Sequence, residues 1–574
     1  MNNLLILSDG IKQDKIEKKF KLVFAGQGLR ETIKFYKKKN EFLIINNIYS
    51  KSKINQKSIE FENYFNQILK ILTLSLNNFH KTNFSERYWT FLISPWLTFF
   101  LRFLFNKWIR LEKVKKTIEI DNMFSLKEDN LYYKNFCPIN GNDIHQLNSN
   151  ISWHYFIDKI LVKKFFKNIV FLEIYDDKIS NNYPQNNIKI FKKDFLNLTK
   201  KNKFFFYHND FSQLSLNLLN LKLYQLPNTS SFDLLKNNNY DYGTRSNFKL
   251  LNNKKIKDEF LNFILSEIKF HIPVSLIENY FKNVSLVNNS SWPEYPKIIV
   301  STKGLWSNDA FSFYLAEKTE KYLTKLYYIQ HGSEYGTSKF FFSENLEVNL
   351  SDKFFSWGWK NNDKIIPLGI INNSKIFKKP NLIKKIIFIT RLQKFKFNFH
   401  HGHFYDEAWI SHLASNIKFI RSLRKKNFNE KIIIRLKKTG NYTHDQKSYH
   451  KLNNIIIDKG DKNLNTYKDK YFFIFSYNSS VFLEHLSQNI PCMCLIDDSY
   501  EFNEKAQKYI NILKDLNIVC DNPEDLANKY LSNIKNFENW WNSEKNFKQR
   551  EIFCINYAKK EKNIFKNFLN YFDD

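Results

Sequence analysis

The chain has 574 residues, of which 43% are hydrophobic, 17% aromatic and 25% charged. This hydrophobic and aromatic content excludes a disordered chain, and the length predicts several globular domains. The formal net charge of +31 would by itself suggest a polyanionic partner or an anionic membrane surface.

The basic residues are mostly Lys, since only 10 of the 88 are Arg, and only 13 residues of the chain are Gly. The abundant Lys, Asn, Ile, Phe and Tyr all have AT-rich codons, so a mutational bias explains much of the charge. The charge is therefore not taken as evidence for nucleic-acid binding, and no nucleic-acid partner is predicted. Places where the scarce Gly, Arg and His gather are more informative.

The termini and the cysteines bear on the cellular compartment. The N-terminal residues MNNLLILSDGIKQDK lack a basic start and a long apolar run, so no signal peptide is expected. The most apolar segment, 88–101, contains Pro95 and is short for a spanning helix, which favours a core or interfacial helix. The five cysteines lack paired spacing and are expected to be buried thiols. These features predict a cytoplasmic protein, with an option of peripheral contact at the inner membrane.

In chain order, the first 50 residues predict strands at 22–26 and 42–47. Apolar residues then recur every three or four positions over about 55–115, which predicts long helices. The region of about 120–290 mixes helical stretches, Asn-rich loops and a strand at 204–208.

From residue 293 the pattern alternates regularly between strands and helices. A strand at 296–302, a helix at 307–323 and a strand at 326–330 form a βαβ unit with parallel strands. A second series continues from residue 384, with expected strands at 384–390, 431–436, 471–476 and 491–496, helices at 406–426 and 479–488, and a helical tail over 500–572.

We therefore predict an α/β fold with two Rossmann-like lobes around a cleft. The boundaries are an N-terminal lobe at 1–360 with a helical insertion at about 55–115, a linker at 361–383, a C-terminal lobe at 384–545 and a C-terminal helix at 546–574. Ligands of open parallel sheets bind beyond the carboxyl ends of the strands, so the turns after strands are the candidate sites.

The turn YIQHGSEYG at 328–336 is the first candidate. His331 follows directly after the strand that ends at Gln330, and Gly332 and Gly336 allow a tight backbone path close to a ligand. His331 is a candidate general acid or base, or a phosphate ligand when charged. The alternative is a structural turn with a hydrogen-bonded His.

The second candidate is the turn before the helix of FSYNSSVFLEHL at 475–486. Asn478, Ser479 and Ser480 stand at the helix N-terminus, where backbone N–H groups and the helix dipole favour an anion such as a nucleotide phosphate. An ordinary helix cap is the alternative, because Ser and Asn favour that position in any helix.

Further candidates are single residues near strand ends. Asp309, at a helix start after a strand, is either a cap or a catalytic base or nucleophile. Arg435 and Arg391 each end or follow a strand and are candidate phosphate clamps. The basic stretch 421–438 is either a membrane-facing surface or a solvated helix face. His400, His401 and His403 match no known metal motif, so no metal is predicted.

Several segments together resemble a bacterial family of transferases encoded in O-antigen and surface-polysaccharide gene clusters. The segments are RYWTFLISPWLTFFLRFLFNKW (87–108), WPEYPKIIVSTKGLWSNDAFSFYLAEK (292–318), IQHGSEYGTSKFFFSENLEVNLSDKFFSWGW (329–359), RLKKTGNY (435–442) and SYNSSVFLEHLSQNIPCMCL (476–495). The resemblance implies the glycosyltransferase B-type fold, distantly similar to Kdo transferases, and usually no metal. Two departures are Ser333 in place of the second Gly of QHGG, and Lys438, Thr439 and Gly440 in place of a Pro-His-Asp-like stretch.

The resemblance implies a glycosyltransferase that moves a sugar from a nucleotide-activated donor, such as CMP-Kdo, to a surface-polysaccharide or lipid-linked glycan. No cofactor beyond the nucleotide-sugar substrate is expected. In related enzymes a Ser pair at a helix start holds the donor phosphate, and Ser479 and Ser480 match that pair. The other residues expected to bind the donor are Asn478, Arg435, Arg391, Gln330, Gly332 and Gly336. The alternatives are a CDP-polyol phosphotransferase of similar fold, a non-catalytic scaffold, and a nucleic-acid-binding protein that the charge alone would suggest.

Overall fold

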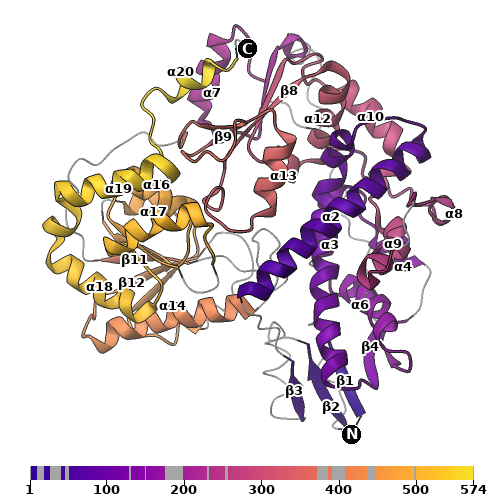
Figure 1. The fold of residues 1–574 in the computed structure, drawn as a ribbon, viewed down its shortest axis with the longest axis horizontal. Helices are drawn as coiled ribbons and strands as arrows, with labels where there is room; N and C mark the ends of the chain where they lie inside the picture. The colour runs from indigo at the N-terminus through magenta and orange to yellow at the C-terminus, as the bar shows by residue number, and fades with distance from the viewer. Residues whose placement is uncertain are drawn as a thin grey trace.

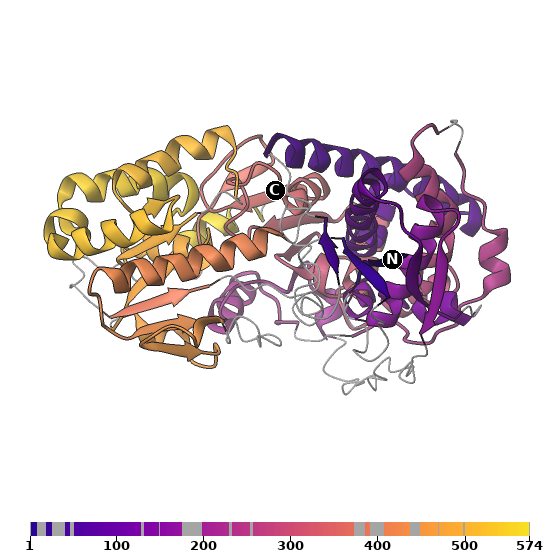
Figure 2. The ribbon, with the colours of Figure 1, turned by 90° about the horizontal axis from the view of Figure 1, so that it is seen from below.

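The computed structural model describes residues 2–8, 19–25, 41–45, 51–127, 131–148, 150–174, 198–228, 232–252, 256–371, 385–390, 407–436, 448–468, 470–496 and 500–572. Its strands form three sheets in which every neighbouring pair of strands is parallel. The predicted α/β class is confirmed, and the chain before the C-terminal lobe carries two of the three sheets. Figure 2 shows the C-terminal sheet with its helices on one side of the molecule and the N-terminal strands on the other.

The N-terminal sheet has the strand order β3-β2-β1-β4-β5. Three of these strands, β1, β4 and β5, were not predicted, because each is a short run and several of their pairings join distant parts of the chain. For example, β1 pairs with β4 more than 110 residues later, so local pattern gives little signal. The strands are β1 (Asn2–Ile6), β2 (Phe20–Phe24), β3 (Phe42–Ile44), β4 (Asn122–Leu126) and β5 (Val170–Ile174).

The middle sheet has the sequential order β10-β9-β8-β7-β6. Side chains alternate between its faces, so Ile298 and Val300 pack in one apolar cluster and Ile299 in another. The strands are β6 (Phe204–Tyr207), β7 (Ile298–Ser301), β8 (Lys325–Ile329), β9 (Lys353–Ser356) and β10 (Ile365–Pro367). The last of them lies inside the predicted linker at 361–383.

The C-terminal sheet has the order β13-β12-β11-β14-β15-β16. This is the doubly wound order, in which the chain leaves the first strand toward one edge and later returns to build the other. The point where the direction changes lies between β11 and β14, so their carboxyl ends are the expected ligand-binding position. The strands are β11 (Ile386–Ile389), β12 (Ile432–Arg435), β13 (Ile455–Asp458), β14 (Phe472–Phe475), β15 (Cys492–Leu495) and β16 (Val519–Cys520).

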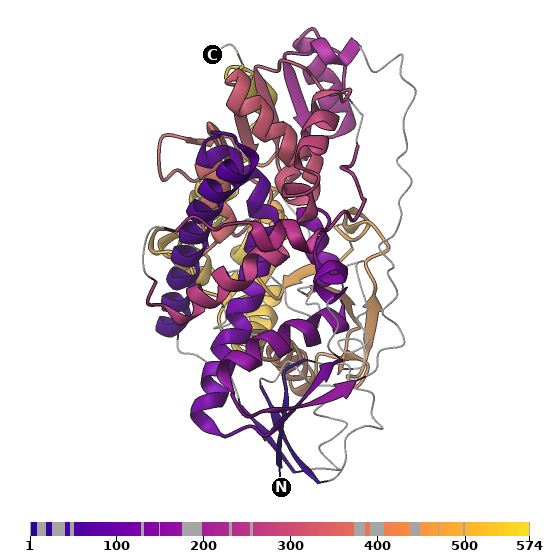
Figure 3. The same ribbon diagram turned by 90° about the vertical axis from the view of Figure 1, so that its right-hand side faces the viewer.

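Two long helices, α2 (Lys51–His80) and α3 (Glu86–Thr117), lie in the chain between β3 and β4 of the N-terminal sheet. Figures 1 and 3 show α3 running from the helices of the middle sheet down to the N-terminal strands. By length and composition α3 would suffice to cross a membrane, but its most apolar 18-residue window is 100% buried inside the protein. The core helix that the sequence predicted is therefore confirmed. It extends beyond the apolar segment, and its buried Lys107 is paired with buried Asp158.

The remaining helices cover the sheets. Those of the N-terminal and middle parts are α4 (Leu131–Phe136), α5 (Ile144–Leu147), α6 (Ile151–Phe165), α7 (Gln213–Lys222), α8 (Tyr242–Asn247), α9 (Glu259–His271), α10 (Tyr280–Asn288), α11 (Gly304–Ser307), α12 (Asp309–Tyr322) and α13 (Phe342–Leu350). Those of the C-terminal part are α14 (Glu407–Lys425), α16 (Ser480–Ser487), α17 (Glu504–Asp515), α18 (Pro523–Lys535), α19 (Glu544–Tyr557) and α20 (Ile564–Leu569).

The end of the chain returns from the C-terminal lobe to the middle sheet. Figure 1 shows α20 beside α7, far from the other C-terminal helices. Phe568 and Phe572 pack with Phe355 and Tyr327 on one face of the middle sheet. The backbone N–H of Lys559 also donates to the Trp357 carbonyl oxygen at 2.7 Å. The two parts of the molecule are therefore joined by this return as well as by the chain before β11.

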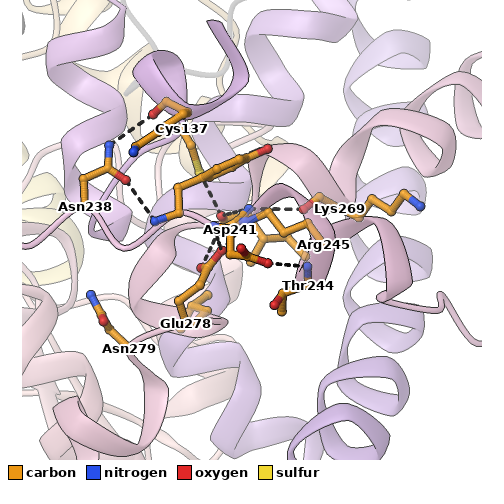
Figure 4. Close-up of polar contacts among 12 residues, drawn as sticks. Cys137, Asn238, Asp241, Thr244, Arg245, Lys269, Glu278 and Asn279 are labelled. Atoms are coloured by element: carbon orange, nitrogen blue, oxygen red, sulfur yellow. Dashed lines mark hydrogen bonds and ion pairs between the residues drawn. The ribbon is translucent and has the colours of Figure 1, made fainter. Parts of the chain in front are cut away.

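A buried ion pair holds the helices below the middle sheet together (Figure 4). Arg245 is fully buried, and its guanidinium donates to both carboxylate oxygens of Glu278, at 2.7 and 2.8 Å. A further guanidinium nitrogen donates to the Ile272 carbonyl oxygen at 2.7 Å, and the Tyr240 ring lies 4.4 Å from the guanidinium carbon. Cys137 is buried beside the same carbonyl, so burial raises the pKa of its thiol to about 12. The cysteines predicted to be buried are so, except that Cys554 is partly exposed.

Candidate functional site

The two turns singled out in the sequence come together in the structure. Ser333, in the turn after β8, donates its hydroxyl to the Asn478 carbonyl oxygen at 2.9 Å. Asn478, in the turn after β14, donates its side-chain amide to the Ser333 carbonyl oxygen at 3.2 Å and to Thr337 Oγ1 at 3.2 Å. An antiparallel bridge between Ser338 and Phe502 lies in the same region. The carboxyl edges of the middle and C-terminal sheets therefore meet at the two predicted turns.

Gln330 ties the first turn to the following strand. Its side-chain oxygen accepts from the Trp357 backbone N–H and from Trp359 Nε1, both at 2.8 Å. Its side-chain nitrogen donates to the Gly332 carbonyl oxygen at 2.7 Å. Gln330 is 2% exposed. Gln330 therefore joins the QHG turn to Trp357 and Trp359 by hydrogen bonds. These bonds fix the backbone on both sides of His331.

Gly336 is needed for packing as well as for its backbone conformation. Its φ is +70°, and a Cβ there would lie 2.4 Å from the Trp359 indole ring. Gly358 and Gly369 also have positive φ, and their Cβ positions would meet backbone oxygens of Ile555 and Lys559 in the returning C-terminal segment. The concentration of scarce glycines in this region therefore reflects close contacts that position the turn.

Substituting Gly336 with Ala should lower the free energy of unfolding by about 1–3 kcal/mol, because the new Cβ collides with a buried ring at a left-handed position. The shift of the urea midpoint measures this loss. Gly332→Ala in the same turn is the matched control, because its Cβ would make only ordinary contacts with Tyr335 at 3.4 Å. Equal midpoints for the two variants would contradict the packing argument.

His331 begins a chain of polar contacts that leads into the protein. Its half-buried ring lies with both nitrogens 3.3 Å from the Tyr335 hydroxyl oxygen. That hydroxyl donates to one carboxylate oxygen of Glu347 at 2.7 Å, and Trp306 Nε1 donates to the other at 2.6 Å. His331 lies just after β8, as the sequence predicted. The structure also shows that Tyr335 and Glu347 connect it to the protein interior.

Two carboxyl groups near this chain of contacts have raised pKa values. Burial raises the pKa of Glu347 to about 8, against the hydrogen bonds from Tyr335 and Trp306 that lower it. Burial likewise raises the pKa of Glu344, which accepts from the Gly336 backbone N–H at 2.7 Å, to about 7. The carboxyl groups were not predicted as site residues. Their signal in the sequence is a pair of acids three positions apart on a helix, α13, that has no other charged residue.

Asp309 follows β7 at the start of α12, so it lies at the same carboxyl edge of the middle sheet as His331. Asn308, one residue earlier, is the helix cap, because its side chain accepts from the Phe311 backbone N–H. The half-buried Asp309 carboxylate accepts from the Asn142 backbone N–H at 3.0 Å. Burial and the nearby charge of Asp143 raise the pKa of Asp309 to about 7. A carboxyl group that changes charge near neutral pH suits acid–base chemistry. The hydrogen bond from the Asn142 backbone also connects α12 to the segment before α5.

The second turn presents the N-terminus of α16. Ser479 is the helix cap, since its buried hydroxyl accepts from the Phe482 backbone N–H at 3.1 Å. Ser480 is the first residue of the helix and is half-buried. The first backbone N–H groups of a helix lack intrahelical acceptors and attract anions. The cap that the sequence left as an alternative is present, and Ser480 remains accessible for a ligand.

Arg435, the predicted arginine that the structure describes, does not join this group. Arg435 donates to Asp458 at 2.6 Å and to the Lys462 carbonyl oxygen at 2.7 Å, which ties β12 to the turn after β13. Arg435 ends β12, which is separated by β11 from β14, the strand that precedes the α16 turn. Arg391 lies outside the described residues, as do the histidines at 400, 401 and 403. Among the residues that the structure describes, no group of three metal-ligating side chains occurs.

Comparison with known proteins places the chain in one family. The model of a family described as LIC12162 family transferase matches residues 5–572. A solved structure described as a candidate UDP-N-acetylglucosamine 2-epimerase from Listeria monocytogenes is similar to 55% of this chain and 84% of its own, with 11% identity and a TM-score of 0.32. An O-GlcNAc transferase mutant from Thermobaculum terrenum is similar to 55% of this chain and 59% of its own, with 8% identity and a TM-score of 0.29. No curated protein matches.

Proposed function

The chain belongs to the LIC12162 family of transferases, and we propose that the group it transfers is a sugar from a nucleotide-activated donor. The acceptor in this proposal is a surface-polysaccharide or lipid-linked glycan. The observation that carries the proposal is the position of the α16 N-terminus. It lies at the carboxyl end of β14, at the point where the strand order of the C-terminal sheet changes direction, and is hydrogen-bonded to the turn of His331.

In this proposal the C-terminal sheet binds the donor. The N-terminus of α16 and the hydroxyls of Ser479 and Ser480 hold the nucleotide phosphate, and the helix dipole stabilises the charge of the leaving nucleotide. This is why the proposal requires no metal. The middle sheet brings His331 and Asp309 to the reacting side. CMP-linked donors such as CMP-Kdo are the first to test. The cytoplasmic face of the inner membrane is the proposed place of action, with the basic residues of 421–438 toward its anionic lipids.

The phosphate assignment can be tested by nucleotide release from CMP-Kdo and other nucleotide-sugars. Ser480→Ala and the double variant Ser479→Ala/Ser480→Ala should lower kcat/KM for the donor by about 10- to 100-fold, since a hydrogen bond to a charged group contributes about 1.5–3 kcal/mol. Unchanged kcat/KM in the double variant would rule out this phosphate site.

Loss of the Ser479 cap alone costs about 1 kcal/mol of stability, so a matched cap control is needed. Ser543 caps α19 by accepting from the Asn546 backbone N–H at 3.4 Å, far along the chain from α16. Ser543→Ala should leave kcat/KM at the wild-type value. A product with a new phosphodiester linkage would instead identify a polyol-phosphate transferase.

A further inference from the structure

A second histidine stands at the carboxyl edge of the middle sheet, two strands away from His331. His208 follows β6 directly, as His331 follows β8, and its side chain is exposed. The sheet order places β7 between β6 and β8. Lys303 and Ser307, in the segment after β7, are exposed as well. None of these three residues was predicted as a site residue, because the predicted strand at 204–208 included His208, whereas β6 ends at Tyr207.

The backbone of His208 has an unusual conformation that other groups hold in place. Its φ is +42°, in the left-handed region that non-glycine residues seldom occupy. The His208 carbonyl oxygen accepts from both the backbone N–H and the hydroxyl of Thr302. Its ring stacks on Tyr207, with ring centres 4.5 Å apart. Backbone strain of this kind tends to occur where a side chain must be aimed for function.

Ser307 holds the ring of His208 through Nδ1, which lies 2.7 Å from the Ser307 hydroxyl oxygen. The same oxygen lies 3.3 Å from the Gly304 carbonyl oxygen, to which the hydroxyl can donate. In the tautomer with the proton on Nδ1, the 2.7 Å contact is a hydrogen bond from Nδ1 to Ser307. In this tautomer Nε2 has the lone pair and can accept a proton. Burial and the nearby charge of Lys303 both lower the pKa of His208, so the ring is neutral near pH 7.

The donor-binding helix lies along this same edge. At its start, Asn478 contacts the turn after β8. Burial raises the pKa of Glu484, one turn further along the helix, and the charge of Asp210, in the loop after β6, adds to this rise. On the carboxyl edge of the middle sheet β6 lies two strands from β8, and neighbouring strands are about 4.8 Å apart. A sugar on a phosphate at Ser480 would therefore lie between α16 and the edge that carries His208.

We propose that His208 is the general base that accepts the proton of the acceptor hydroxyl, with Ser307 as the residue that positions its ring. This inference rests on the proposed sugar transfer. In the reaction, the acceptor oxygen forms a bond to the anomeric carbon of the donor sugar. The bond between that carbon and the phosphate oxygen breaks, and its electron pair leaves with the nucleotide. The acceptor O–H bond breaks, and its proton moves to His208 Nε2.

The test compares His208 variants with wild type for transfer and for nucleotide binding. His208→Asn is the first variant, because Asn tolerates a left-handed conformation and cannot act as the base. We expect its kcat for transfer to fall by about 10²- to 10⁴-fold, while the Kd for the nucleotide of the donor stays at the wild-type value. Added imidazole should restore part of the activity of His208→Ala. The exposed His450→Asn is the matched control and should transfer normally.

The role of Ser307 has its own readout. Ser307→Ala should lower kcat by about tenfold without changing KM for the donor, because it affects only the orientation of the base. Transfer by His208→Asn at the wild-type rate would overturn the inference while leaving the sugar transfer intact. Loss of nucleotide binding together with transfer in that variant would also overturn it. Wild-type protein that releases nucleotide from no donor would overturn the sugar transfer itself, and this inference with it.

Discussion

Glu278→Gln is expected to lower the free energy of unfolding by about 3–5 kcal/mol, because it leaves the Arg245 guanidinium charged and buried without its counterion. Arg245 is fully buried, and both of its bonds to Glu278 are charge-assisted and well aligned with the carboxylate. Glu278 also accepts from the Asp241 backbone N–H at 3.1 Å. The variant therefore loosens the junction of α8, α9 and the segment before α10.

Urea unfolding monitored by tryptophan fluorescence measures the change. The matched control is Glu544→Gln, whose partner Lys548 and own side chain are 68% and 79% exposed, so the expected loss is below about 1 kcal/mol. The double variant Arg245→Met/Glu278→Leu should recover much of the stability, because removing both partners leaves no buried charge. A Glu278→Gln variant as stable as the Glu544→Gln control would show that the buried pair contributes nothing net.

The sequence predicted the regular part of the fold because its signals there are local. The strands β7, β8, β11, β12, β14 and β15 are short apolar runs with helical patterns between them, so each βαβ unit could be located from its own residues. The N-terminal sheet gave weaker signals, since β4 and β5 lie beyond two long helices from β1. The separation into two sheets before residue 368 depends on those distant pairings and could not be inferred from local periodicity.

The candidate site was predictable where scarce residues follow strands. His331, Gly336 and the Ser pair at 479 and 480 were located in this way, and the structure brings their turns together. The sequence could not indicate whether each of these residues binds a ligand or holds the turns together. Gln330 and Asn478 were expected to bind the donor, and the structure shows them engaged in contacts that hold the two turns. Glu347 was missed because only tertiary packing buries it beneath Tyr335.

Glu347→Gln is expected to reduce the pH dependence of stability between about pH 4.5 and pH 8. The folded-state pKa of Glu347 is raised to about 8 from an ordinary 4.5, mainly by burial. Between these values the folded protein holds a proton that the unfolded chain has released. The stability that this group contributes is therefore complete below about pH 4.5. It is lost as the pH rises to about 8, at no more than about 1.4 kcal/mol per pH unit.

Urea midpoints measured from pH 5 to pH 9 should fall less steeply in Glu347→Gln than in wild type. The curves of the two proteins should therefore separate as the pH rises toward about 8 and run parallel above it. A residual slope should remain, because the pKa values of Glu344 and Asp309 are also raised, to about 7. Glu544→Gln, on the exposed face of α19, should keep the wild-type slope. If Glu347→Gln keeps that slope as well, the carboxyl group is already ionised at neutral pH. The contact chain from His331 through Tyr335 would then end on a negative charge, which would hold a charged His331 in place and favour phosphate binding by it over proton abstraction.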